Sequence, residues 1–366
     1  MGATSKPRYP YEPDTVFPPG DTLAEWLDER GMTQAELAAR TGLSTKHVNQ
    51  IVKGVAPVTP ETALGLESVT RVPAHLWNSL EVSYRSYLTR CAEGERLAQD
   101  TGWLDELPVA ELVRRGRIEK RSSGAERVKE VCTFFGVASA AAWRGLWQQP
   151  AAAYRASKAF TKNPGAVAAW LRIGEIEGSA IECGEFSKSS LRALLPELRS
   201  LTTEPDPDVW VPAVRERFRR VGVAFVVEPE IRGSRLNGAT KWLAANKALV
   251  QISTRQKRHD IAWFTLFHEI GHLLLHSKKD TFINDGEEQG AGGVETEADA
   301  YAQRVLIPRE HEPALGRLHT VDDVERFAAS IGIAPGIVVG RLQHMGWWKR
   351  SEGNHLRWPF DWPPTP

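Results

Sequence analysis

Residues 260–276, DIAWFTLFHEIGHLLLH, decide how the C-terminal part of this chain folds. When the segment is wound as an α-helix, its apolar side chains cover every side, which is typical of a helix in a protein interior. Yet His268, Glu269 and His272 stand at its centre. Buried polar and charged groups are costly without partners, so these three side chains need a partner.

The spacing of the two histidines favours a metal ion as that partner. His268 and His272 are four residues apart, on one face of the helix, so two imidazoles can converge on one cation at about 2.0–2.1 Å. Glu269 lies about 100° round the helix from His268, where it can hold a water molecule at the metal and take its proton. The competing interpretation is a pair of satisfied core histidines beside an ion-paired glutamate. We predict the metal site, with Glu269 as the catalytic residue.

A catalytic site of this type needs a third protein ligand and an open position. His276 follows His268 by eight residues, about 12 Å along the helix axis, so both cannot join His272 on one ion, and we assign His276 to the surroundings of the site. Glu295 is the expected third ligand, and Glu297 is its competitor.

Asp299, one turn after Glu295, is expected to accept an imidazole N–H and to fix its tautomer. The alternative for this acidic segment is a solvated first helical turn. The His₂Glu ligand set favours Zn²⁺ and also accepts Mn²⁺. Tyr301, His311 and His319 are candidates for stabilising an oxyanion.

Upstream residues predict a small antiparallel β-sheet. Residues 223–229, VAFVVEP, form one expected strand, and residues 236–253, LNGATKWLAANKALVQIS, predict a hairpin that turns near 245–247. A peptidase commonly holds its substrate as a strand added to a sheet edge. Residues 237–240 are a candidate edge, with Gly238 permitting close backbone approach, although a turn or bulge glycine fits equally well.

Residues 21–90 contain short helices with clear start and stop signals. Thr33, Ser44 and Thr59 are expected N-caps, Glu36 is expected to complete a capping box with Thr33, and Gly54 is an expected C′ residue. A tight turn before Ser44 leads into a helix whose polar side suits the DNA major groove. The expected DNA contacts are Gln34, Ser44, Thr45, Lys46, Asn49, Gln50 and Lys53.

The charge of this region argues against DNA binding. Residues 21–90 hold 7 Lys+Arg and 8 Asp+Glu, so 7 − 8 gives a net charge of −1, without the usual basic footprint. Over the whole chain, 46 Lys+Arg balance 46 Asp+Glu. Weak or dimer-dependent DNA binding and a purely protein-binding module remain alternatives. A basic run at 114–121, RRGRIEKR, suits phosphate contacts or, more commonly, a solvated helix face.

Two parts of the chain resemble known families. HEIGHLLLH (268–276) followed by ETEADAYAQRVLIP (295–308) resembles the ImmA/IrrE family of bacterial metallopeptidases, over roughly residues 205–345. This resemblance implies a zincin-type fold and cleavage of a protein, typically a DNA-binding repressor. Tyr301 stands where that family often has Phe, and Asp299 where Asn is common. The first ninety residues, above all 18–69, resemble XRE-type helix-turn-helix repressors, particularly HigA-like antitoxins.

A chain of 366 residues is too long for one compact domain. We expect a mainly α protein with a small antiparallel sheet. The predicted parts are a flexible arm (1–20), an all-α helix-turn-helix domain (21–90), a helical middle region (91–204), an α+β zincin-like metallopeptidase domain (205–350) and a Trp/Pro-rich tail (351–366). Three scattered cysteines and the lack of a long apolar run indicate a soluble protein of a reducing cytoplasm, without a membrane partner.

The leading functional hypothesis is a DNA-binding regulator whose zinc metallopeptidase domain cleaves a protein partner: a repressor, an antitoxin or a toxin partner. The rival is a non-proteolytic, antitoxin-type transcriptional repressor with a structural or sensory metal site. In a third version, occupancy of operator DNA gates the protease. A homodimer is expected, because helix-turn-helix repressors usually span two half-sites.

Overall fold

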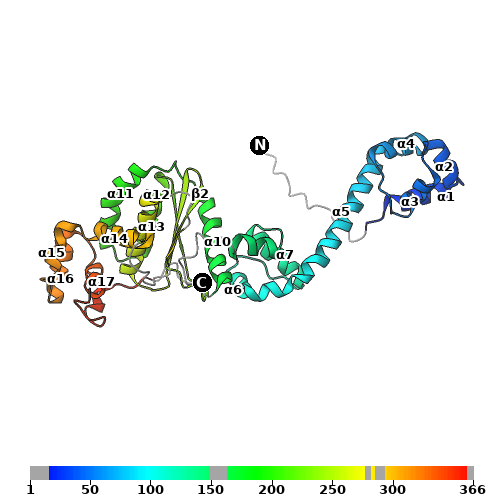
Figure 1. The fold of residues 1–366 in the computed structure, drawn as a ribbon. Coiled ribbons are helices and arrows are strands. Elements are labelled where there is room, and N and C mark those ends of the chain that lie inside the picture. Colours follow the sequence, from blue (N-terminus) through cyan, green and yellow to red (C-terminus); the bar gives the residue numbers. More distant parts are fainter. Residues whose placement is uncertain (1–15, 149–162, 277–281, 285–292, 361–366) are drawn as a thin grey trace, which may run out of the picture. The chain divides into compact units, whose positions relative to one another are not determined.

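The computed structural model describes residues 16–148, 163–276, 282–284 and 293–360 (Figure 1). Contacts divide the chain into two compact units, Met1–Gln99 and Asp100–Pro366. Residues 1–15 of the expected arm and 361–366 of the expected tail lie outside the described residues. A search of the described helices finds none with the length and apolar character needed to cross a bilayer.

The N-terminal unit consists of five helices: α1 (Pro19–Glu29), α2 (Gln34–Thr41), α3 (Thr45–Val52), α4 (Pro60–Thr70) and α5 (Ala74–Gln99). Its core is a single apolar cluster in which the largest fully buried side chain is Trp77. Helix α1 begins inside the expected arm, and α5 continues nine residues beyond the expected domain end at residue 90. The helix start and stop signals recognised in the sequence therefore delimit helices of this unit.

The three expected N-caps are confirmed. The side chains of Thr33, Ser44 and Thr59 each accept a hydrogen bond from the backbone N–H three residues later, at 3.1–3.2 Å. The expected capping box at Thr33 is wrong, because the Glu36 carboxylate turns instead to Arg40, one helical turn further on, at 2.5 Å. An i,i+4 ion pair has thus replaced the reciprocal cap.

The C-terminal unit is built round a four-stranded sheet in the order β1-β3-β2-β4. Its strands are β1 (Val223–Glu228), β2 (Gly238–Ala244), β3 (Lys247–Ser253) and β4 (Phe282–Asn284). The expected hairpin is present, since β2 and β3 pair antiparallel across a short turn. The mainly α character and the small sheet are confirmed.

The sheet is mixed, so the expectation of a purely antiparallel sheet is wrong. Strand β1 pairs parallel with β3, in the register Val223↔Ala248 to Glu228↔Ser253. The connection over residues 229–237 is long enough to carry β2 one position away, which leaves room for β3 beside β1. Every residue of β1 is buried. That pattern is typical of a strand covered on both faces.

Helices cover both faces of the sheet (Figure 1). One face packs against α10 (Pro164–Ala180), where Gly174 and Gly178 allow close contact with the side chains of β3. The other face packs against α12 (Pro207–Arg220) and α13 (His259–Leu275). The central metal-site helix of the sequence prediction, α13, is therefore sandwiched between the sheet and the C-terminal helices.

Further helices complete this unit. They are α6 (Val109–Arg114), α7 (Gly124–Phe135), α8 (Ala140–Trp143), α11 (Lys188–Ser200), α14 (Val294–Leu306), α15 (Glu312–Leu315), α16 (Val321–Ile331) and α17 (Pro335–His344). Short 3₁₀ or π turns cover Thr101–Glu106, Arg144–Gln148, Leu201–Thr203, Arg309–His311 and Asn354–Leu356.

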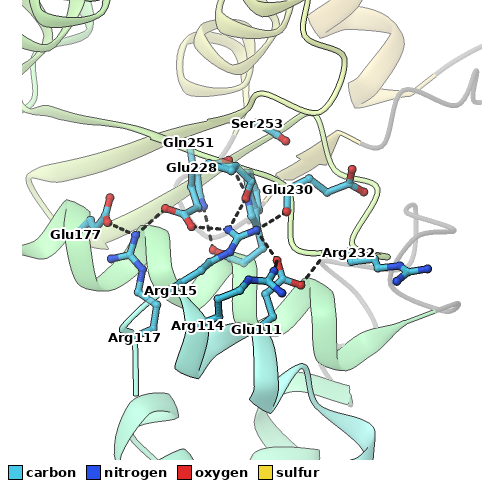
Figure 2. A network of polar contacts seen from close by, with 12 residues as sticks. Glu111, Arg114, Arg115, Arg117, Glu177, Glu228, Glu230, Arg232, Gln251 and Ser253 are labelled. Carbon is cyan, nitrogen blue, oxygen red and sulfur yellow. Dashed lines mark hydrogen bonds and ion pairs between the residues drawn. The ribbon is translucent and has the colours of Figure 1, made fainter. Parts of the chain in front are cut away.

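The basic run at 114–121 is solvated only in part, since the side chain of Arg114 is 75% exposed whereas Arg115 and Arg117 turn inward. Arg115 donates to Glu228 at 2.9 Å, and Arg117 donates to the second oxygen of the same carboxylate at 2.8 Å (Figure 2). Arg115 also donates to Glu111 and to the backbone carbonyls of residues 229 and 230. Arg115 and Arg117 thus form a clamp that holds the loop after β1 on the end of α6.

The segment near residue 360 is no loose tail. The backbone N–H of His259 donates to Trp358 O at 3.0 Å, and that of Phe360 donates to Lys257 O at 3.0 Å. Phe360 is buried against Trp210. These contacts anchor the first turn of α13 to residues 357–360.

Candidate metal centre and DNA-binding helix

Two packed helices bring the polar residues of the C-terminal unit together. Helix α13 is buried along most of its length, whereas α14 exposes one side. His268 and His272 are each 1% exposed, and Glu269 is fully buried. Burying a fully apolar helix would be more favourable. Partners must therefore offset the free-energy cost of burying these three polar side chains.

Three side chains converge on one point. His268 Nε2 lies 2.9 Å from His272 Nε2 and 3.1 Å from Glu295 Oε2, and His272 Nε2 lies 3.5 Å from Glu295 Oε1. Ligands that bind one tetrahedral ion at about 2.0–2.1 Å lie about 3.3 Å from one another. The observed separations bracket that value, so the donor set fits a metal ion.

The other acidic and histidine candidates lie around this triad. Asp299 Oδ1 is 2.8 Å from His268 Nδ1, the ring nitrogen that faces away from the other two ligands. The His276 ring lies beyond the triad, where its Nε2 donates to the Val294 carbonyl at 3.1 Å. Glu297, the competitor for third ligand, is 67% exposed and approaches only His276, at 3.8 Å. The geometry therefore places Glu295, and not Glu297, with the two histidines.

Glu269 lies between α13 and the sheet. Thr240 donates to its Oε2 at 2.6 Å, whereas Oε1 has no hydrogen-bond partner among the described residues. A Cβ built on Gly238 would lie 2.5 Å from Oε1, so only glycine leaves room for this carboxylate. The sequence analysis marked Gly238 for close approach but missed Thr240, whose only signal is its place two residues later on the same strand.

The buried groups of this cluster shift one another's pKa values. Burial opposes the charged form of His268, but hydrogen bonds to Asp299 and Glu295 outweigh it and raise its pKa to about 10. Burial likewise raises the pKa of Glu269 to about 8. Despite burial, hydrogen bonds from both histidines lower the pKa of Glu295 to about 2. Burial lowers the pKa of His272. A cation that binds here must displace protons, so its affinity depends on pH.

A cavity of about 460 Å³ opens beside the triad. His268, Glu295 and Asp299 line it, and so do apolar side chains of α13, α14 and α17. Of the three oxyanion candidates, Tyr301, His311 and His319, none lines this cavity, whereas His344 of α17 does. The sequence analysis missed His344 because nothing in its local pattern connects α17 to α13.

The expected substrate-binding edge is covered. Residues 238–240 of β2 pair antiparallel with β4, in the register Gly238↔Asn284 to Thr240↔Phe282. In the described sheet, β4 is therefore the edge strand on this side, and residues 237–240 are not. The expectation is wrong because β4 lies far along the sequence and carries no strand signal of its own.

The expected DNA-contacting residues cluster on α2 and α3. Ser44, Thr45, Lys46 and Lys53 are exposed, and Gln34, Asn49 and Gln50 are half-buried. Asn49 Nδ2 donates to Gln34 Oε1 at 3.1 Å, which ties the first residue of α2 to α3. Val48 and Ile51, on the opposite side of α3, are buried. The structure thus gives α3 one polar surface and one core surface.

A short helix pair with a polar outer helix and a buried His-His-Glu cluster define the class of this protein. It joins an N-terminal helix-turn-helix domain to a C-terminal domain of metallopeptidase type. Residues 23–77 match the family model for the helix-turn-helix, and residues 234–343 match that for the IrrE N-terminal-like domain, Peptidase M78. The C-terminal domain is therefore similar to the IrrE N-terminal-like domain over residues 234–343.

Among solved structures, the chain is similar to an addiction module antidote protein of the HigA family from Coxiella burnetii. The two are 26% identical, with a TM-score of 0.22, over 23% of this chain and 92% of that one. No curated protein matches the chain.

Proposed function

We propose that the C-terminal domain is a zinc-dependent endopeptidase in which His268, His272 and Glu295 hold the ion. The observation that carries this proposal is their convergence at 2.9–3.5 Å beside a buried carboxylate, Glu269, with one unpartnered oxygen. Two imidazoles and a carboxylate are ligands that Zn²⁺ prefers, and Mn²⁺ is the second candidate. A bound ion would also satisfy buried groups that are otherwise costly.

The chemistry divides between the ion and Glu269. When bound, Zn²⁺ supplies a Lewis acid that polarises a carbonyl and lowers the pKa of a water molecule. Glu269 Oε1 would accept a proton from the attacking water and pass it to the leaving amine. Thr240 holds Oε2, which leaves Oε1 as the oxygen that carries the proton. Asp299 accepts the N–H of His268 and so keeps Nε2 directed at the ion.

The cavity favours an enzyme over a structural or sensory metal site. Structural zinc sites are closed by four protein ligands, whereas a catalytic site keeps one position open. Here three ligands are present and two of them, His268 and Glu295, line a cavity of about 460 Å³. The rival, a non-proteolytic antitoxin-type repressor, predicts no use for that space.

We further propose that the N-terminal domain binds operator DNA through α3. Ser44, Thr45 and Lys46 at its exposed start, with Asn49 and Gln50, would contact base edges, while Gln34 and Lys53 would contact phosphates. The protein would act in the bacterial cytoplasm as a homodimer, since paired half-sites compensate for the low positive charge of this domain. Its substrate would be a repressor, antitoxin or toxin partner, and DNA occupancy would gate the cleavage.

The direct test pairs metal analysis with cleavage. Zinc content and proteolysis of a repressor encoded beside this gene are measured for the full chain, for Glu269→Gln and for the matched control Glu297→Gln. We expect one zinc per chain in all three and a loss of cleavage of about 10²–10⁴-fold in Glu269→Gln only. Undiminished cleavage by Glu269→Gln would remove that residue from the mechanism, and a chain that binds zinc without cleaving anything would support the rival.

A further inference from the structure

The cavity beside the triad changes character along α13. Its near end is formed by His268, Glu295 and Asp299. Its middle is apolar, with Ile261 and Phe264 of α13 facing side chains of α14 and α17. It then reaches Asp260, eight residues before His268, which corresponds to about 12 Å along the helix axis. That depth exceeds the length of one side chain. A ligand that fills the cavity would therefore place one group at the triad and a different group at the far end.

The far end is built from segments that meet at Asp260. Arg357 donates to Asp260 Oδ2 at 2.8 Å and to Gln343 Oε1 at 2.8 Å. Gln343 donates in turn to the backbone carbonyl of residue 350. Gly340 of α17 also lies here, since a Cβ on it would be 3.2 Å from Asp260 Oδ2. The loop that carries Arg350 is thereby fixed next to this end of the cavity.

Positive charge is in excess at this far end. Asp260 and Arg357 neutralise each other, since both are nearly buried and two nitrogens of Arg357 donate to Asp260 Oδ2. Arg341 lines the cavity with 18% of its side chain exposed, and its nearest carboxylate oxygen, on Glu312, is 3.7 Å away. Arg350 also lines the cavity, and no carboxylate among the described residues pairs with it.

We propose that Arg341 and Arg350 form a carboxylate-binding subsite that selects the substrate of the peptidase. The assignment of this subsite to a substrate cleft rests on the proposed peptidase function. A guanidinium in a partly dehydrated cavity recognises a carboxylate through charge-assisted hydrogen bonds, and a neutral amide of the same shape loses that charge. The preferred peptide has an apolar residue near the scissile bond and a carboxylate about 12 Å from the ion.

That carboxylate has two possible sources, an acidic side chain within the substrate or a free C-terminus. Four acetylated peptides distinguish them. Ala-Ala-Leu-Glu-Ala amide is compared with Ala-Ala-Leu-Gln-Ala amide for the side chain, and Ala-Ala-Leu-Gln acid with its amide for the C-terminus. Binding to the full chain is measured by calorimetry, both metal-free with chelator and loaded with zinc.

We expect the carboxylate member of at least one pair to bind about tenfold more tightly than its neutral partner, with or without zinc. The preference should shrink to less than about twofold when both arginines are neutralised (Arg341→Gln with Arg350→Gln). Arg350→Gln alone, at an exposed position, should weaken it partially and guards against misfolding of the double variant. The control is Arg326→Ala, an arginine 77% exposed on α16 that does not line the cavity, and it should change nothing.

Equal binding within both pairs would overturn the subsite, and so would a preference that survives the double substitution, or no binding by any peptide. The peptidase proposal is tested separately, by cleavage. A preference that persists in a chain that cleaves nothing supports the subsite and removes the peptidase. Cleavage without any carboxylate preference does the reverse.

Discussion

Two buried carboxylates of the C-terminal unit, Glu228 and Glu269, are satisfied in opposite ways. Both oxygens of Glu228, 3% exposed at the end of β1, are held by arginines, at 2.9 and 2.8 Å (Figure 2). Glu269 has one hydroxyl donor on Oε2 and none among the described residues on Oε1. Burial raises the pKa of both groups.

This difference separates a structural network from a reactive one. Because both oxygens of Glu228 are paired with arginines, this carboxylate fixes the loop after β1 and offers no free oxygen to a ligand. A carboxylate left incomplete, beside two imidazoles with converging nitrogens, is the arrangement that active sites use to shift proton affinities. Arg117 Nε in the first cluster is also buried without a partner among the described residues, so what distinguishes the two clusters is whether both oxygens of the carboxylate itself are paired.

The largest effect is expected from breaking the complete network. Arg115→Met leaves the buried Glu228 carboxylate with one arginine fewer and removes the contacts to residues 229 and 230. We expect the free energy of unfolding to fall by about 3–5 kcal/mol in chemical denaturation, with zinc still bound by the folded protein. The control is Arg114→Met, the neighbouring residue with a 75% exposed side chain, which should change stability by less than about 0.5 kcal/mol. If Arg115→Met left the free energy of unfolding unchanged, the contacts of Arg115 would not stabilise the fold.

The incomplete cluster should respond to an ion instead. Zinc at a free concentration of one hundred times its dissociation constant should stabilise the full chain by about 2.7 kcal/mol, read as a rise in the unfolding midpoint. Glu295→Gln should lose most of that rise, whereas Glu297→Gln should keep it, because Glu297 is exposed and pairs with His276 rather than with His268 or His272. Equal responses in the two variants would contradict the ligand assignment.

A third prediction concerns pH in the metal-free protein. The pKa of Glu269 rises from 4.5 to about 8 on folding, so its protonated form is favoured in the native state. Its contribution to stability is therefore present below pH 4.5 and is lost as pH rises through about 8. His268, with a pKa raised to about 10, adds a loss between pH 6.5 and 10.

Glu269→Gln removes the first of these two losses and reduces the second, because the charge of Glu269 contributes to the raised pKa of His268. The advantage of this variant in free energy of unfolding over the metal-free parent should therefore grow from pH 5 to pH 8. Denaturation curves in chelator across that range measure it. A constant difference between the two proteins would mean that Glu269 titrates normally.

The smallest effect is expected at Thr240. Its hydrogen bond lowers the pKa of Glu269, against the dominant effect of burial. Thr240→Val, which keeps the shape of the side chain, should move the acidic limb of the kcat/KM profile to higher pH by about one unit and reduce the rate at neutral pH several-fold. An unchanged profile would indicate that the hydroxyl only packs against the carboxylate.

The sequence predicted much of the site because its signals are local. His268 and His272 share one helical turn, and Glu295 and Asp299 share another, so spacing alone indicates which residues face together. The N-caps at Thr33, Ser44 and Thr59 are local in the same sense, since each bonds three residues ahead. Local geometry is fixed by helical periodicity, which does not depend on the rest of the fold.

The parts that the sequence could not predict join distant segments. The parallel pairing of β1 and β3 depends on which strand of the β2–β3 hairpin lies next to β1. The clamp between Arg115 and Glu228 joins residues 113 positions apart. Arg115 and Arg117 of the basic run turn inward because their counter-charge, Glu228, lies on β1. Thr240 meets Glu269 only once the sheet packs on α13. No periodic pattern carries such tertiary information.

The anchoring of α13 by residues 357–360 has a consequence for the order of events during synthesis. The helix that carries both histidines leaves the ribosome long before the residues that hold its first turn. The N-terminal unit has its own core and can complete its fold much earlier. A nascent chain would thus complete its helix-turn-helix domain first and its candidate metal centre last, so chain order alone delays the assembly of that centre.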